Sequence, residues 1–160
     1  MRPYLIAFLL LLASSHTPLN AQGFEPLTAD TAKIRADWEA NQYRYSEGYL
    51  YLKKYYGSAA KRDSVHYLYP SDEEPCAFVE AFKQGIEYRL LNCDEEGGTE
   101  ERLRFPRMEL KQAQKFINHL FYNQENKWKD GHHYGPEGAG CYYHILQSDD
   151  FTEIRIWCGC

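Results

Sequence analysis

The spacing of four cysteines constrains the fold of this chain more than any other feature of its sequence. The pairs are Cys76 with Cys93, and Cys141 with Cys158. Each pair is symmetric about a dipeptide, and these dipeptides are Gln84-Gly85 and Asp149-Asp150. If each dipeptide is a two-residue hairpin turn, the paired cysteines lie directly opposite each other on non-hydrogen-bonded positions of the strands. Opposite Cα atoms there approach to about 4.5 Å, which a disulfide accepts, so the sequence predicts two disulfide-tied hairpins.

A pair of opposite charges supports the predicted register of the first hairpin independently of the cysteines. The same turn places Glu80 opposite Arg89, an opposite-charge pair that is favourable across strands. Five cysteines leave one over, so the count alone does not select a pairing. The main competitor of the predicted pairing is a Cys141–Cys160 bridge.

The N-terminal segment, Met1 to Ala21, has the organisation of a secretory signal peptide. Arg2 supplies a basic start, Leu5 to Ala13 is an unbroken apolar run, and Ala21 is a small residue at the expected cleavage point. Ala13-Ser14-Ser15 is an alternative site. We therefore expect a secreted or periplasmic protein, in a compartment where disulfides persist.

Cleavage leaves residues 22–160, the size of one domain, which we expect to have the α+β class. Loss of Arg2 changes the net charge from −5 to −6, which makes nucleic acid an improbable partner. No segment after the leader is apolar enough to span a membrane.

Apolar periodicity predicts two helices that pack on an antiparallel sheet. The first is an N-terminal helix over Thr28 to Tyr56, which Gly48 can interrupt, and the second is an amphipathic helix over Pro106 to Tyr122 with Phe116, Ile117 and Leu120 facing the core. The predicted strands are Ser64 to Tyr69, Cys76 to Lys83, Ile86 to Cys93, Arg102 to Phe105, and the two strands of the hairpin Cys141 to Cys158.

Alternation assigns the side chains of the second hairpin to two faces. The face predicted to join the core carries Cys141, Tyr143, Ile145, Ile154, Ile156 and Cys158. The opposite, surface-like face carries Tyr142, His144, Glu153, Arg155 and Trp157. Tyr142 and Trp157 are expected to lie opposite each other there, as aromatic side chains suited to an interface.

Cysteine and histidine offer two routes to chemistry near the C-terminus. Cys158-Gly159-Cys160 has the form of a redox pair or a soft-metal site, but an oxidising compartment favours a structural bridge and one spare thiol. Cys141 with His144 or His133 has the composition of a cysteine nucleophile, but Cys141 opens a strand and has a disulfide partner. We therefore predict no catalytic residue.

The segment from Trp128 to His144 is the predicted working surface. It is long, rich in glycine and held between firm elements, as binding loops often are. Two adjacent histidines in such a loop can converge on a metal with a carboxylate, although a non-metal binding role is preferred. The predicted partner-binding residues are Trp128, His132, His133, Tyr134, Tyr142 and Trp157.

These features predict a small exported protein that acts by binding and not by catalysis. The preferred function is binding of a macromolecular partner, as an inhibitor or immunity protein does, with no cofactor and no metal. The first alternative is a glycan or cell-wall binding module that uses Tyr142, Trp157 and Trp128. The second is a metal or redox protein that uses the histidine loop and Cys158-Gly159-Cys160.

Overall fold

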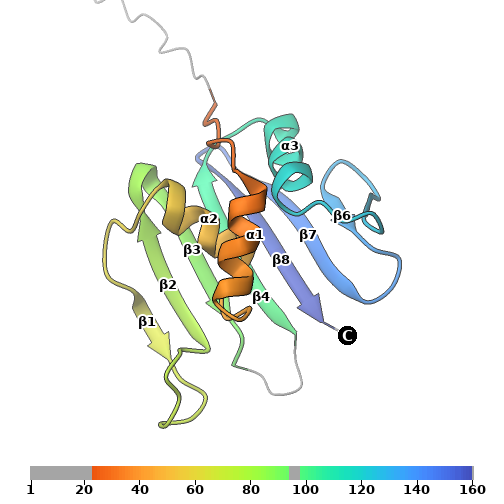
Figure 1. Ribbon diagram of the computed structural model, residues 1–160. Coiled ribbons are helices and arrows are strands. Elements are labelled where there is room, and N and C mark those ends of the chain that lie inside the picture. The colour runs from red at the N-terminus through yellow and green to blue at the C-terminus, as the bar shows by residue number, and fades with distance from the viewer. Residues whose placement is uncertain (1–22, 94–97, 160) are drawn as a thin grey trace, which may run out of the picture.

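A computed structural model describes residues 23–93 and 98–159 of the chain. Within these ranges the chain forms three α-helices and one eight-stranded antiparallel sheet (Figure 1). The helices are α1 (Thr31–Ala40), α2 (Glu47–Tyr55) and α3 (Leu110–Leu120). The strands are β1 (Asp63–His66), β2 (Ala77–Phe82), β3 (Ile86–Leu91), β4 (Thr99–Pro106), β5 (Lys127–Trp128), β6 (His133–Gly135), β7 (Gly140–Gln147) and β8 (Phe151–Gly159). The predicted signal peptide and Cys160 lie outside the described residues.

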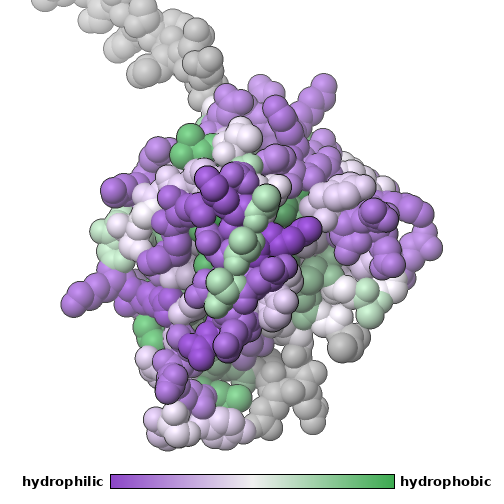
Figure 2. Space-filling model, viewed as in Figure 1, coloured by the Kyte–Doolittle hydropathy of each residue, from purple (hydrophilic) through white to green (hydrophobic). Residues whose placement is uncertain are grey.

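The strand order is β1-β2-β3-β4-β8-β7-β6-β5, so the second hairpin joins β4 and continues the sheet. All three helices lie on the same side of the sheet, which faces the viewer in Figure 1. Figure 2 shows that the outer surface on this side is mainly hydrophilic. We call the opposite side of the sheet the open face. In the described residues no helix is long and apolar enough to cross a membrane.

The N-terminal region contains two helices where the apolar pattern predicted one. Helix α1 ends at Ala40, and Ser46 begins the next helix as an N-cap, with its hydroxyl accepting a hydrogen bond from the Tyr49 amide (3.1 Å). Gly48 does not interrupt the region; it lies in the first turn of α2. The apolar spacing was continuous because both helices turn residues toward the same core, including Ile34.

The α1–α2 connection has a helix-terminating hydrogen-bond pattern. The Gln42 amide donates to the Glu39 carbonyl (2.9 Å) and the Tyr43 amide donates to the Trp38 carbonyl (3.1 Å). Trp38 and Tyr43 are also in ring contact at 4.6 Å, the hydrophobic contact that accompanies this Schellman motif. Gln42 occupies the position where glycine is usual, with φ = 53°.

The Gln42→Gly variant is therefore expected to be more stable than the wild type by about 0.5–1 kcal/mol, because glycine adopts this conformation without the Cβ penalty. Urea unfolding followed by circular dichroism measures the change. Gln124→Gly, at an exposed position without positive φ, is the matched control and should give no gain. A less stable Gln42→Gly protein would contradict this account of the turn.

The first hairpin has a different register from the predicted one. Lys83 joins the turn, which spans Lys83–Gly85, and Phe82 pairs with Ile86. The reason is tertiary: the Lys83 amide donates to the Gly57 carbonyl (3.2 Å) and leaves the ladder. The predicted Glu80–Arg89 pair is consequently wrong. Glu80 pairs with Tyr88 and points toward the helices, whereas Arg89 pairs with Val79.

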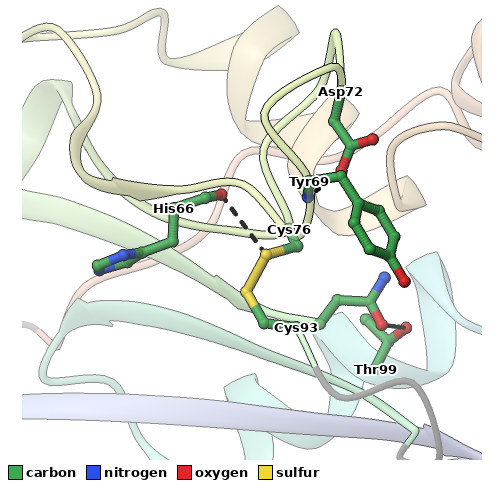
Figure 3. Close-up of a disulfide and its surroundings, with 7 residues drawn as sticks. His66, Tyr69, Asp72, Cys76, Cys93 and Thr99 are labelled. Atoms are coloured by element: carbon green, nitrogen blue, oxygen red, sulfur yellow. Dashed lines mark hydrogen bonds between the residues drawn. A yellow bond between two sulfur atoms is a disulfide. The ribbon is translucent and has the colours of Figure 1, made fainter.

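The Cys76–Cys93 disulfide is present although the register that led to it is wrong. Strand β3 ends at Leu91, and the Asn92 amide donates to the Cys76 carbonyl (2.9 Å), so Asn92 takes the position opposite Cys76. Cys93 is one residue further along, and its Cα lies 5.0 Å from that of Cys76. Figure 3 shows this disulfide beside the His66 carbonyl oxygen, which lies 3.5 Å from the Cys76 sulfur. The bridge thus ties the β1–β2 connection to the end of β3.

The second hairpin confirms its predicted register. Cys141 pairs with Cys158 in the ladder, their Cα atoms are 4.1 Å apart, and the two sulfurs are bonded. Cys141 is therefore not a free thiol, and its interpretation as a nucleophile is excluded. The Ser148 amide donates to the Phe151 carbonyl (2.9 Å), which closes the two-residue turn at Asp149-Asp150.

Aromatic side chains of the helices and the sheet form the centre of the core. Helix α3 buries the predicted stripe of Phe116, Ile117 and Leu120. It begins at Leu110 and ends at Leu120, so it is shorter at both ends than the predicted helix over Pro106 to Tyr122. Phe116 packs against Phe105 of β4 (5.3 Å between ring centroids) and Tyr51 of α2 (5.2 Å). The structure thus packs α3 through this stripe. The predicted loop segment from Trp128 to His144 contains the short strand β6 and the end of β5.

Candidate partner-binding face

The open face is formed by alternate residues of the strands. Because β8 begins directly after the two-residue turn, alternation puts Trp157 and Arg155 on the open face, with Ile154 and Ile156 buried beneath the helices. This division agrees with the predicted faces of the second hairpin. Glu153 also lies on the open face but, unlike Arg155 and Trp157, it is only 3% exposed.

An aromatic pair lies at one end of this face. Tyr142 and Trp157 are directly opposite in the ladder, with ring centroids 5.9 Å apart, and the Trp157 residue is 43% exposed. Two glycines leave room for the rings: a Cβ on Gly135 would lie 2.7 Å from the Tyr142 ring, and one on Gly159 would lie 2.7 Å from the Trp157 ring. The Lys129 ammonium lies 5.3 Å from the centre of the Tyr142 ring. The pair thus presents an apolar surface beside a cation.

A row of basic side chains crosses the middle of the open face. The sheet pairing aligns one basic residue from each of five neighbouring strands: His133, His144, Arg155, Arg102 and Arg89. With strands about 4.8 Å apart, the row is about 19 Å long. Like charges directly opposite each other destabilise a sheet. The three adjacent arginines therefore carry a cost that the fold itself does not require.

Carboxylates offset part of this charge. Glu100 accepts a hydrogen bond from Arg102 (2.6 Å), and Glu153 accepts from both Arg155 (2.8 Å) and Arg104 (2.9 Å). Burial opposes ionisation of Glu153, but the hydrogen bonds from the two arginines lower its pKa below the ordinary value. These contacts explain why Glu153 is buried on a surface-like face. Arg89 forms no ion pair with any described residue.

Two histidines at the end of the row are in contact. The rings of His133 and His144 stack at 4.1 Å with an interplanar angle of 16°. Asp130 fixes His133 through its Nδ1 atom (2.8 Å), and amide groups of His132 and His133 lower the pKa of Asp130 to about 2. Burial, His133 and Arg155 lower the pKa of His144. A positive charge on His144 is therefore disfavoured at this position.

The structure does not bring all six predicted partner-binding residues together. His133, Tyr142 and Trp157 meet on the open face around a depression of about 540 Å³, whose lining also includes part of Tyr134. Trp128 and Tyr134 stack at 5.0 Å on the helix side, where the Trp128 indole donates to the Asn118 side chain. His132 turns its Nδ1 atom to the Ile145 carbonyl (3.1 Å).

Sequence reasoning missed the arginines of β3 and β4 as site residues. Arg102 also lines the depression, and Arg89 extends the row to the next strand. Their alternation with buried Leu103 and Tyr88 indicates an exposed face, but only the strand order reveals that they line up with Arg155. In the two described ranges, no group of three histidine, cysteine or acidic residues is arranged to hold a metal ion.

No family model matches the chain, and no curated protein or solved structure matches it either.

Proposed function

We propose that this is an exported, non-catalytic protein that binds another protein through the open face, in the manner of an inhibitor or an immunity protein. The observation that carries the proposal is the alignment of Arg89, Arg102 and Arg155 on neighbouring strands. An acidic surface on the partner would offset the repulsion among these arginines. The two disulfides are compatible with export.

Charge and aromatic surface have separate roles in this proposal. The chain is acidic overall, so the three aligned arginines form a local positive patch on it. Such a patch orients the approach of an acidic partner surface and increases the association rate. Tyr142 and Trp157 then supply the desolvated anchor, since tyrosine, tryptophan and arginine are the commonest interface hot spots. The anchors lie on paired strands and not on loops, so little ordering cost opposes binding.

The experiment is affinity capture with cross-linking, using the mature protein as bait and the secreted and envelope proteins of its source, followed by titration with the purified partner. Trp157→Ala should weaken binding by about 30-fold, the loss of a typical aromatic anchor. Arg155→Ala should reduce the association rate and its dependence on salt. Each variant is compared with the wild type by circular dichroism to establish that it is folded.

The matched control is Tyr122→Ala, which removes an aromatic ring that is 63% exposed and belongs to the helix side. It should bind the partner as the wild type does. If a folded Trp157→Ala protein kept full affinity, the open face would not be the binding surface.

A further inference from the structure

A second concave surface lies on the helix side, away from the open face. It is a cleft of about 560 Å³ between the α1–α2 connection, the end of α3 and the ends of β4 and β8. This size is within the range of sites for small ligands. The Cys141–Cys158 disulfide belongs to its lining and fixes the strands beneath it.

Two exposed tyrosine rings line the cleft, and they come from parts of the chain that are far apart in sequence. Tyr43, in the α1–α2 connection, is 62% exposed, and Tyr122, after α3, is 63% exposed. Tyr43 has φ = 62°, a left-handed conformation that is unusual for a bulky residue. The Arg44 amide donates to the Asn41 carbonyl (3.1 Å) and closes a turn around Gln42 and Tyr43, so both left-handed residues belong to this turn. The turn leaves the Tyr43 ring exposed at the cleft, where it contacts Trp38 (4.6 Å between ring centroids).

Polar groups line the cleft together with the rings. Glu101 is 6% exposed and accepts a hydrogen bond from the Tyr88 hydroxyl (3.0 Å). The Glu47 carboxylate lies 3.7 Å from the Arg35 guanidinium. Burial raises the pKa of both glutamates, so each is more readily protonated than an ordinary glutamate. Of the two, Glu47 is the more exposed, and its carboxylate oxygens can accept hydrogen bonds from a ligand.

Charge and backbone pairing restrict the class of ligand. The lining carries both carboxylates and guanidinium groups, Arg35 and Arg44 among them, so it has no excess of one charge sign that would select an anion or a cation. Strand β4 is paired with both β3 and β8, and β8 is paired with both β4 and β7, so these strands have no free edge for an added peptide strand. A neutral ligand with many hydroxyl groups and flat apolar faces fits the remaining features.

We propose that this cleft binds one or two sugar rings of a neutral oligosaccharide, with Tyr43 and Tyr122 contacting the apolar ring faces and Glu47 hydrogen-bonding to hydroxyls. This site is independent of the protein-binding function of the open face. A protein with both would attach to a glycan through one side and to a protein through the other.

The test is calorimetric titration and NMR shift mapping of the mature protein with three neutral probes: N,N′-diacetylchitobiose, cellotetraose and maltotetraose. At least one should bind, with shifts concentrated at the cleft. Tyr43→Ala and Tyr122→Ala should each lower the affinity for that probe by about 10-fold, the loss expected from one aromatic contact. Trp157→Ala should leave it unchanged, which separates this site from the open face.

Tyr67→Ala is the matched control, because Tyr67 is also a half-exposed tyrosine and belongs to a different depression beside β1. It should bind the probe as the wild type does. The proposal is overturned if none of the three probes binds at millimolar concentration. It is equally overturned if a probe binds and folded Tyr43→Ala and Tyr122→Ala proteins retain full affinity, or if Tyr67→Ala loses as much as they do.

Discussion

Replacing Phe116 with alanine is expected to lower the free energy of unfolding by about 3–5 kcal/mol. Phe116 is 7% exposed and is the residue of α3 that joins three other aromatic rings, those of Tyr51, Phe105 and Phe121. Removal of its ring loses the transfer free energy and leaves a cavity between a helix and the centre of the sheet, where rigid aromatic neighbours cannot collapse into it. Guanidinium unfolding followed by tryptophan fluorescence measures the change.

The neighbouring Lys115→Ala substitution is the control, because Lys115 is exposed on the same helix. It should change the free energy of unfolding by no more than about 0.5 kcal/mol. Equal and small effects of the two substitutions would show that α3 does not contribute its apolar stripe to the core.

The two hairpins show which part of the fold was predictable from local sequence. In the second, the turn at Asp149-Asp150 and the Cys141–Cys158 pair depend on residues close in the chain, and both were predicted. In the first, a hydrogen bond from Lys83 to Gly57, a residue outside the hairpin, lengthened the turn by one residue. That single residue shifted β3 by one position, so Tyr88 and not Arg89 lies opposite Glu80, and Arg89 points to the other face of the sheet.

The break between α1 and α2 could not be read from apolar spacing alone. Ile34 and Leu52 are both buried, because the two helices present apolar residues to one core across the turn. The better indications were the polar run at Asn41 to Arg44 and Ser46, a favourable N-cap residue. The prediction placed a possible interruption at Gly48, but Gly48 lies inside α2.

The candidate face was predictable only in part. Alternation within one hairpin placed Tyr142 opposite Trp157 correctly, because the register depends on one turn. The basic row requires the order of five strands, including the contact of β4 with β8 across an intervening helix in sequence. Trp128 was grouped with Trp157 among the predicted partner-binding residues, but β5 turns it toward the helices, where it contacts Tyr134. The side of the sheet on which Trp128 lies depends on the pairing of the short strands β5 and β6.

The second large effect is expected at Glu80, whose carboxylate is buried on the helix side at 3% exposure. It accepts hydrogen bonds from the Tyr49 hydroxyl (2.7 Å), the Lys53 ammonium (3.1 Å) and the Arg62 guanidinium (3.2 Å), and also from Ser58. Glu80→Gln keeps one acceptor oxygen but loses the charge and places an amide NH₂ among donors. We expect a loss of about 3 kcal/mol at pH 7, because several charge-assisted bonds weaken at once.

The pH dependence gives this substitution its sharpest test. Burial opposes ionisation of Glu80, but hydrogen bonds from Ser58, Tyr49, Lys53 and Arg62 lower its pKa below the ordinary 4.5. An acid with a lowered pKa in the folded state stabilises the protein above the unfolded pKa, and that stabilisation is lost as the pH falls through the folded pKa. The stability difference between the wild type and Glu80→Gln should therefore be largest near pH 7 and shrink steadily below pH 4.5. Urea unfolding at a series of pH values measures it, with Glu73→Gln, an exposed position, as the control. A difference that stayed constant down to strongly acidic pH would mean that the charge of Glu80 does not stabilise this network.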